Sequence, residues 1–190
     1  FQNTTDFNRN IRSWDISSSV VLTNMFTDAS GMNIRFNGFP GFSNTPTNDF
    51  FNVVPIPDNL TFINEIINWI DNSQNPQFID PVNNPYYTPI TSWETGLVTD
   101  MSNAFNFNDA SGFNEALYWN TDNVTNMQSM FNNAQYFNQN IGKTDFYWNV
   151  TNVTDMSGMF NGASSFNNAG ETDISGWNTS SISNAIFMFA

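Results

Sequence analysis

The chain contains no cysteine and no histidine, and lysine and arginine together account for only 4 of its 190 residues. The absence of cysteine excludes disulfides, thiolate metal sites and a cysteine nucleophile. The absence of histidine removes the commonest general base, and the single lysine, Lys143, falls in a loop between two sequence repeats. Because catalysis would depend on carboxylates that are better explained as caps and turns, we predict that the chain is not an enzyme.

Positive charge is scarce, whereas 17 aspartates and glutamates give a formal net charge of -13. Such a charge repels phosphate backbones and anionic lipid headgroups. The sequence has no apolar run of the roughly 20 residues needed to cross a bilayer, and its start lacks a signal-peptide pattern. We therefore expect neither nucleic acid nor membrane insertion. Because the chain begins with Phe1 and not Met, we expect a processed product or part of a longer protein.

Asparagine and phenylalanine are unusually abundant, with 34 and 20 residues respectively. Asparagine-rich chains are often disordered. Aromatic residues make up 16% of this chain, however, and they provide enough apolar surface to offset the conformational entropy lost on folding. The composition therefore predicts a single folded domain whose polarity comes mainly from amides and hydroxyls.

A repeat begins at each of several tryptophans. From Trp119 the chain reads WNTDNVTNMQSMFNNAQYFN, and from Trp148 it reads WNVTNVTDMSGMFNGASSFN, so the two segments align without a gap. The same frame fits Trp93 and Trp177, and fits Trp14 more loosely. We predict one domain with repeats near residues 7–32, 90–112, 113–136, 137–165 and 166–190.

Within a repeat the apolar residues recur at i, i+3, i+6, i+7 and i+10, which is typical of one face of a short helix. Thr125 and Thr154 stand where a helix N-cap is expected, and Ile90 and Ile174 lie in short segments typical of strands. We therefore predict an α/β solenoid, a leucine-rich-repeat-like stack of coils made of strand, turn and short helix. The side chains predicted to form its core are Trp14, Trp93, Trp119, Trp148, Trp177, Met101, Met127, Met130, Met156, Met159, Met188, Phe105, Phe131, Phe160 and Phe189.

A column of asparagines accompanies the repeat, because Asn8, Asn114, Asn138 and Asn167 each follow a phenylalanine at the start of the return loop. Their amides could bond turn backbone in the neighbouring repeat. We predict an amide ladder with this structural role.

Residues 33–86 depart from the repeat and form an insertion or an expanded coil. The stretch PIPDNLTFINEIINWIDN has helical spacing and Asp58 at a suitable cap position, so it predicts a longer helix, with FFNVVP as a strand before it. Trp14 and Trp93 are about three repeat periods apart, so two diverged repeats are the alternative.

The stretches NVTNMQSMFNNAQYFNQNI and NVTDMSGMFNGASSFN resemble the bacterial surface protein 26-residue repeat family, also called BspA-like leucine-rich repeats, whose units read approximately as FNQDISxWDTSNVTNMSxMFxxA. The resemblance covers residues 7–30 and 90–190. It implies a curved leucine-rich-repeat-like solenoid on an exported or cell-surface protein, frequently an adhesin. It brings no catalytic residues.

No cofactor is predicted, and calcium is the best metal candidate because it binds carboxylate, amide and backbone oxygens. The patterns of known calcium loops do not occur. Glycan acceptor motifs occur six times, which would matter in a eukaryotic source, although an asparagine-rich repeat also produces them by chance. The acceptors are Asn3, Asn59, Asn123, Asn149, Asn152 and Asn178.

These observations favour an extracellular structural or adhesive repeat protein that contacts other proteins, glycans or copies of itself. The last repeat ends without a polar cap just after Phe189, so either more chain follows or another subunit stacks there. In the second case head-to-tail contacts could build a filament at the cell surface. The alternative is a carbohydrate- or protein-recognition module that uses Tyr86, Tyr87 and other aromatics of the 33–86 insertion.

Overall fold

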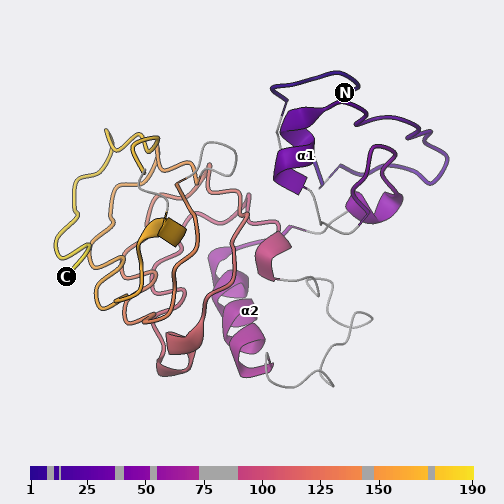
Figure 1. Cartoon of the computed structure of the whole chain (residues 1–190). Coiled ribbons are helices and arrows are strands. Elements are labelled where there is room, and N and C mark those ends of the chain that lie inside the picture. Colours follow the sequence, from indigo (N-terminus) through magenta and orange to yellow (C-terminus); the bar gives the residue numbers. More distant parts are fainter. Residues whose placement is uncertain are drawn as a thin grey trace. The chain divides into compact units, whose positions relative to one another are not determined.

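The structure, a computed structural model, describes residues 1–7, 11–12, 14–36, 41–51, 55–72, 90–142, 148–170 and 174–190 (Figure 1). They form two compact units, Phe1–Pro55 and Ile56–Ala190, and each is described by itself. The boundary between the units falls within the 33–86 region. Asn8, Tyr86, Tyr87 and Lys143 lie outside the described residues.

The N-terminal unit contains helix α1 (Ser30–Phe36) and the 3-10 turn η1 (Asn48–Phe50) around a cluster of aromatic rings. Phe26 is fully buried, with the rings of Phe42 and Phe50 at 5.3 and 5.6 Å. Aromatic pairs at such separations add to the stabilisation from burial itself.

The C-terminal unit contains helix α2 (Asn59–Asn72) and the 3-10 turns η3 (Ile90–Ser92), η4 (Asn108–Gly112) and η5 (Asn168–Gly170). The helix expected in the 33–86 region is confirmed by α2. Asp58 is its N-cap, because its Oδ1 accepts a hydrogen bond from the Thr61 N–H at 2.7 Å. That bond also lowers the pKa of the Asp58 carboxyl.

The predicted α/β leucine-rich-repeat-like solenoid is wrong. The described residues contain no β-strand, and α1 and α2 are their only α-helices. Segments predicted as short helices, such as residues 124–134, are successive turns. Three isolated parallel bridges join the repeats that begin at Trp93, Trp119, Trp148 and Trp177, and they pair Asp100 with Asn126, Asn126 with Asp155, and Asp155 with Asn184.

The turns form because the backbone N–H groups bond to the neighbouring repeat instead of to the fourth residue before them. The Met127 N–H donates to the Asp155 carbonyl at 2.9 Å, and the Phe131 N–H donates to the Met159 carbonyl at 2.8 Å. Within the repeat, bonds close over three residues, as from the Met130 N–H to the Met127 carbonyl. Consecutive three-residue turns therefore reproduce the apolar spacing of a helix.

The threonines predicted as helix N-caps belong to a column between repeats, so that prediction is also wrong. The N–H and Oγ1 of Thr125 both donate to the Thr99 carbonyl, at 2.8 and 3.2 Å. Thr154 bonds to Thr125 in the same way, and Ser183 bonds to Thr154.

Aromatic side chains stack from repeat to repeat. The Trp119 ring lies 6.1 Å from Trp93 and 6.4 Å from Trp148, nearly parallel to both. A second column joins Phe105, Phe131, Phe160 and Phe189 at separations of 5.3, 5.6 and 5.4 Å. Each inner ring is therefore shielded by the repeats on both sides of it.

Helix α2 packs against the Trp93 end of these repeats, at the opposite end from the C-terminal repeat (Figure 1). The rings of Phe62 and Trp119 pack edge to face with their centroids 5.3 Å apart. The Asn59 Oδ1 accepts hydrogen bonds from the N–H groups of Thr99 and Asp100, at 2.9 and 3.2 Å. Asn59 thus takes the place of the carbonyl that a preceding repeat supplies to Thr125 and Thr154.

We predict that Asn59→Ala lowers the free energy of unfolding by about 1 kcal/mol, because two N–H groups lose their protein acceptor. Urea unfolding followed by tryptophan fluorescence measures this change. Leu60→Ala, at a neighbouring side chain that is 72% exposed, should alter stability by less than about 0.5 kcal/mol. Equal midpoints for the two variants would show that the Asn59 contact is not stabilising.

In each repeat, the side chain of the residue that forms the bridge also stabilises the turn that follows it. Asp100, Asn126, Asp155 and Asn184 each accept a bond at Oδ1 from the N–H two residues later. Burial raises the pKa of Asp155, but bonds from the Ser157 hydroxyl and N–H and from the Asn184 amide outweigh it, so its pKa lies below the usual value of 3.8. The folded protein therefore stabilises the charged form of Asp155.

When a carboxyl group has a lower pKa in the folded than in the unfolded protein, its charged form stabilises the fold at pH values above the unfolded pKa. This stabilisation is lost as the pH falls through the folded pKa. We expect Asp155→Asn to reduce stability at pH 7 and to weaken the further loss of stability below about pH 4. Urea unfolding between pH 7 and pH 2.5 tests this, with Asp71→Asn at the exposed end of α2 as control. An unchanged pH profile in Asp155→Asn would contradict it.

Candidate functional site

The Trp177 repeat differs from the other three at two outward positions of its turn. Where they carry polar or small residues, it carries Ile186 and Phe187, which are 64% and 71% exposed. The equivalent residues are Ser102, Gln128 and Ser157 at the first position, and Asn103, Ser129 and Gly158 at the second. The last repeat therefore shows solvent an apolar surface that the other repeats do not have.

The backbone at Phe187 is left-handed, with φ of 56°. The equivalent Asn103, Ser129 and Gly158 have φ of 57°, 52° and 60°, so the repeat itself imposes this conformation. Asparagine and glycine adopt it readily, whereas it is uncommon for a bulky residue such as phenylalanine. A strained and exposed aromatic residue is a reasonable candidate for a functional position.

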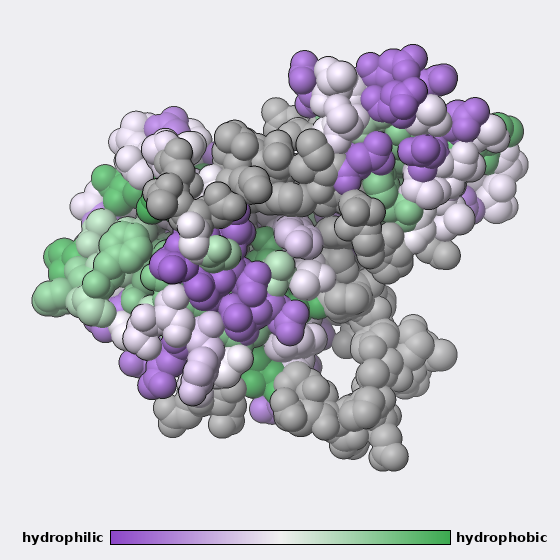
Figure 2. All heavy atoms as spheres, in the orientation of Figure 1, coloured by the Kyte–Doolittle hydropathy of each residue, from purple (hydrophilic) through white to green (hydrophobic). Residues whose placement is uncertain are grey.

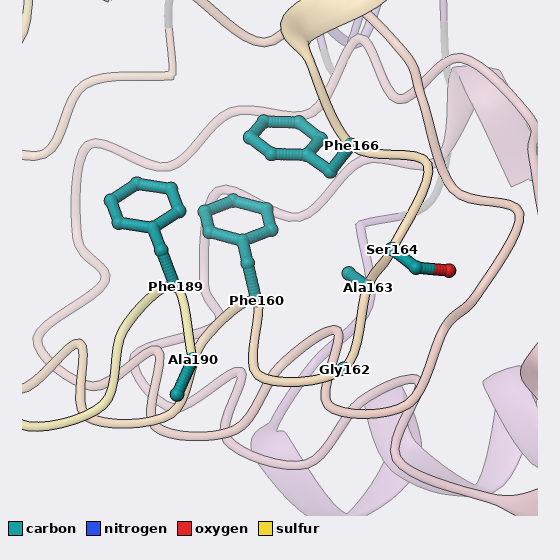
Figure 3. Close-up of a pocket in the computed structure, with 7 residues that line it drawn as sticks. All are labelled: Phe160, Gly162, Ala163, Ser164, Phe166, Phe189 and Ala190. Carbon is teal, nitrogen blue, oxygen red and sulfur yellow. The ribbon is translucent and has the colours of Figure 1, made fainter.

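Phe189 ends the phenylalanine column and is 60% exposed. In the inner repeats the equivalent ring stacks on a second phenylalanine of its own return loop at about 4 Å, in the pairs Phe105–Phe113, Phe131–Phe137 and Phe160–Phe166. In the repeat frame the equivalent second ring would fall after Ala190. Beside it lies an open recess of about 280 Å³, lined by Phe160, Gly162, Ala163, Ser164, Phe166, Phe189 and Ala190 (Figure 3).

The backbone N–H groups that pair the inner repeats have counterparts in the last repeat. In inner repeats the N–H groups of residues such as Met127, Ser129 and Phe131 donate to the next repeat. The equivalent N–H groups of Ala185, Phe187 and Phe189 have no acceptor among the described residues. We call these three residues, together with Ser183 and Ile186, the open edge.

The open edge is uncharged as well as apolar. Residues 174–190 contain no Asp, Glu, Lys or Arg, although the chain as a whole carries a net charge of -13. Figure 2 shows apolar residues gathered at the end of the C-terminal unit where the chain terminates in Figure 1. Contact at this surface would bury little charge, which keeps the cost of desolvation low.

The side chains predicted to form the repeat core are mostly enclosed. Met188 is partly buried, whereas Phe189 is exposed, and Trp14 is 46% exposed in the N-terminal unit with the Phe1 ring 6.0 Å away. The buried ones are Trp93, Trp119, Trp148, Trp177, Met101, Met127, Met130, Met156, Met159, Phe105, Phe131 and Phe160. Sequence reasoning missed Ile186 and Phe187, which an alignment of all four turns could have revealed.

The predicted amide ladder is confirmed for its described members. The Asn138 N–H donates to Asn114 Oδ1 at 2.8 Å, and the Asn167 N–H donates to Asn138 Oδ1 at 2.9 Å. These side chains bond the backbone of neighbouring repeats, so they are structural.

Several candidate glycan acceptors also have structural contacts. The Nδ2 atom that would carry a glycan donates to the neighbouring repeat in Asn123, Asn149 and Asn152, and to Thr99 in Asn59. Asn3 and Asn178 are exposed. A glycan at the first four positions would compete with contacts that hold the repeats together.

The described residues contain no group of three or more acidic side chains placed to hold a metal ion. In the same part of the chain, no helix has the length and apolar character required to span a membrane.

A family model described as "Mycoplasma protein of unknown function, DUF285" matches residues 1–69 and 77–190. This match corrects the resemblance to the BspA-like leucine-rich-repeat family, because the model that fits nearly the whole chain is a different one. No curated protein and no solved structure matches the chain.

Gly162, which lines the recess, gives a test of the local backbone. Its φ is +71°, and an added Cβ would lie 2.7 Å from Asn133 Oδ1. We expect Gly162→Ala to lower the free energy of unfolding by about 1–2 kcal/mol, because a left-handed conformation is costly for residues with a Cβ. Gly112→Ala is the control, since its Cβ would meet nothing within 4 Å. Equal stability of the two variants, measured in urea, would contradict this assignment.

Proposed function

We propose that this chain, which belongs to the DUF285 family, is a structural or adhesive protein that acts by binding a partner and not by catalysis. The observation that carries the proposal is the open edge, where polar residues of the inner repeats are replaced by Ile186 and Phe187. The lack of histidine and cysteine supports a non-catalytic role.

Exposed apolar residues next to a recess are typical of protein interaction sites. Large apolar patches on a folded domain mark contact surfaces, and aromatic side chains in recesses often contribute most of the binding energy. Phe187, at 71% exposure, is suited to such anchoring. A protein partner therefore fits this surface better than nucleic acid or an anionic lipid surface, which the acidic charge would repel.

We place this binding outside the cell or at its surface, the setting expected from the sequence. Protease treatment of intact cells, followed by detection of the chain, tests that placement. Protection of the chain until the cells are lysed would contradict it.

The test of binding restores the polar character of the inner repeats by Ile186→Ser together with Phe187→Asn. We expect the double variant to lose at least about tenfold in binding to a panel of immobilised surface proteins and glycans, measured by biolayer interferometry. Loss of binding to glycans alone would favour a glycan ligand over a protein. Tyr136→Ser, at an aromatic residue that is 63% exposed in the Trp119 repeat, is the matched control.

Two outcomes would count against this site. If neither protein nor glycan bound the wild-type chain, the adhesive function would be rejected. If binding persisted in the double variant but disappeared on replacing Tyr86 and Tyr87 by serine, the contact surface would lie in the 33–86 region.

A further inference from the structure

Two columns of polar side chains cover one face of the inner repeats. Asn123 and Asn152 form one column, and Thr125 and Thr154 form the other, with all four residues exposed. The valine between each asparagine and threonine is fully buried. This alternation is typical of extended backbone, in which successive side chains point to opposite faces. We call the four exposed residues the acceptor face.

The side-chain donors of the acceptor face point into the protein. The hydroxyls of Thr125 and Thr154 donate to the carbonyl of the equivalent threonine in the preceding repeat, at 3.2 and 3.1 Å. The Nδ2 groups of Asn123 and Asn152 donate to turn carbonyls of the preceding repeat, at 2.7 and 2.8 Å. Because a carbonyl can only accept, these bonds fix the orientation of both amides.

The groups left for a ligand are therefore acceptors. Each threonine hydroxyl that donates inward keeps its oxygen lone pairs. Within the described part of the chain, the Oδ1 atoms of Asn123 and Asn152 accept no hydrogen bond. The nearby carboxylates of Asp122 and Asp155 each accept a bond from an asparagine amide of the next repeat, at 2.7 and 3.0 Å. The acceptor face thus suits an uncharged ligand that is rich in donors, such as the hydroxyls of sugars.

The spacing of the repeats selects among such ligands. The N–H groups of Thr125 and Thr154 donate to the threonine carbonyl of the preceding repeat at 2.8 Å, and parallel bridges lie beside them. Rows paired in this way are about 4.8 Å apart. An extended chain of β-1,4-linked sugars advances by a similar distance for each ring and carries hydroxyls along both of its edges.

Going beyond the proposed function, we infer that the acceptor face binds a neutral, extended polysaccharide of β-1,4-linked sugars. The polysaccharide lies along the stack of repeats with one ring at each repeat, and its hydroxyls donate to the oxygens of Asn123, Thr125, Asn152 and Thr154. Because inward hydrogen bonds already hold these side chains, little conformational entropy is lost when the ligand binds.

The experiment titrates the 190-residue chain with cellohexaose, a neutral β-1,4-linked oligosaccharide, by isothermal titration calorimetry. We expect saturable binding that is at least about tenfold tighter than that of cellobiose, because the longer chain meets more repeats. Maltohexaose has the same number of rings but a curved α-1,4-linked chain, so it should bind at least about tenfold more weakly than cellohexaose.

Variants of the threonine column test the site itself. Thr125→Val together with Thr154→Val removes both hydroxyls and should weaken cellohexaose binding at least about tenfold. Thr125→Ser together with Thr154→Ser keeps the hydroxyls and should bind within about threefold of the wild type, since Ser183 makes the same bond to a threonine carbonyl at 3.1 Å. Thr23→Val, at an exposed threonine of the N-terminal unit, is the matched control. Circular dichroism and urea unfolding verify the fold of each variant.

Absence of cellohexaose binding, equal affinity for maltohexaose, or equal effects of the valine and serine variants would overturn this inference. Salt-sensitive binding of oligolysine in place of cellohexaose, lost in the valine variant, would overturn it in favour of a cationic ligand. The Ile186→Ser and Phe187→Asn variant should bind cellohexaose like the wild type. Failure of the proposed function and failure of this inference can therefore be told apart.

Discussion

The structure of the C-terminal unit depends on hydrogen bonds from the backbone of one repeat to the backbone of the next. The N–H groups of Met127 and Phe131 are typical, because they donate to Asp155 and Met159 and are therefore not available for a helix. Left-handed residues such as Ser129 and Asn133 let the chain turn between these bonds. The same bonds bring the tryptophan and phenylalanine rings of adjacent repeats into register, so polar pairing and apolar stacking support each other.

This pairing makes the two ends of the unit chemically different. At the Trp93 end, the N–H of Thr99 needs an acceptor, and the side chain of Asn59 provides it. At the Trp177 end, the repeat carries Ile186 and Phe187 at positions where the inner repeats have polar or small residues. Because each repeat contacts only its neighbours, the first one must be covered in some other way. Here α2 covers it.

The proposed binding surface follows from the same regularity, because a departure from the repeat can be recognised only against it. Ile186 and Phe187 replace polar residues at positions where the backbone conformation is unchanged, as the φ of 56° at Phe187 shows. The fold therefore does not require the apolar side chains, and phenylalanine is an unfavourable choice for that conformation. An interaction that uses these side chains gives a physical reason for their presence.

The sequence by itself determined the repeat frame from Trp93 onward with its tryptophan column, helix α2 with its Asp58 cap, and the ladder of Asn114, Asn138 and Asn167. These features depend on local chemistry and on the identity of aligned residues. Only the tertiary structure decided that the segments after each tryptophan are turns and not strands and helices. The apolar spacing fits both a helix and a series of three-residue turns, and the choice depends on whether an N–H meets a carbonyl four residues earlier or one in the next repeat. The contact of Asn59 with Thr99 was decided at the same level, since no sequence pattern links the first residue of a helix to a turn 40 residues later.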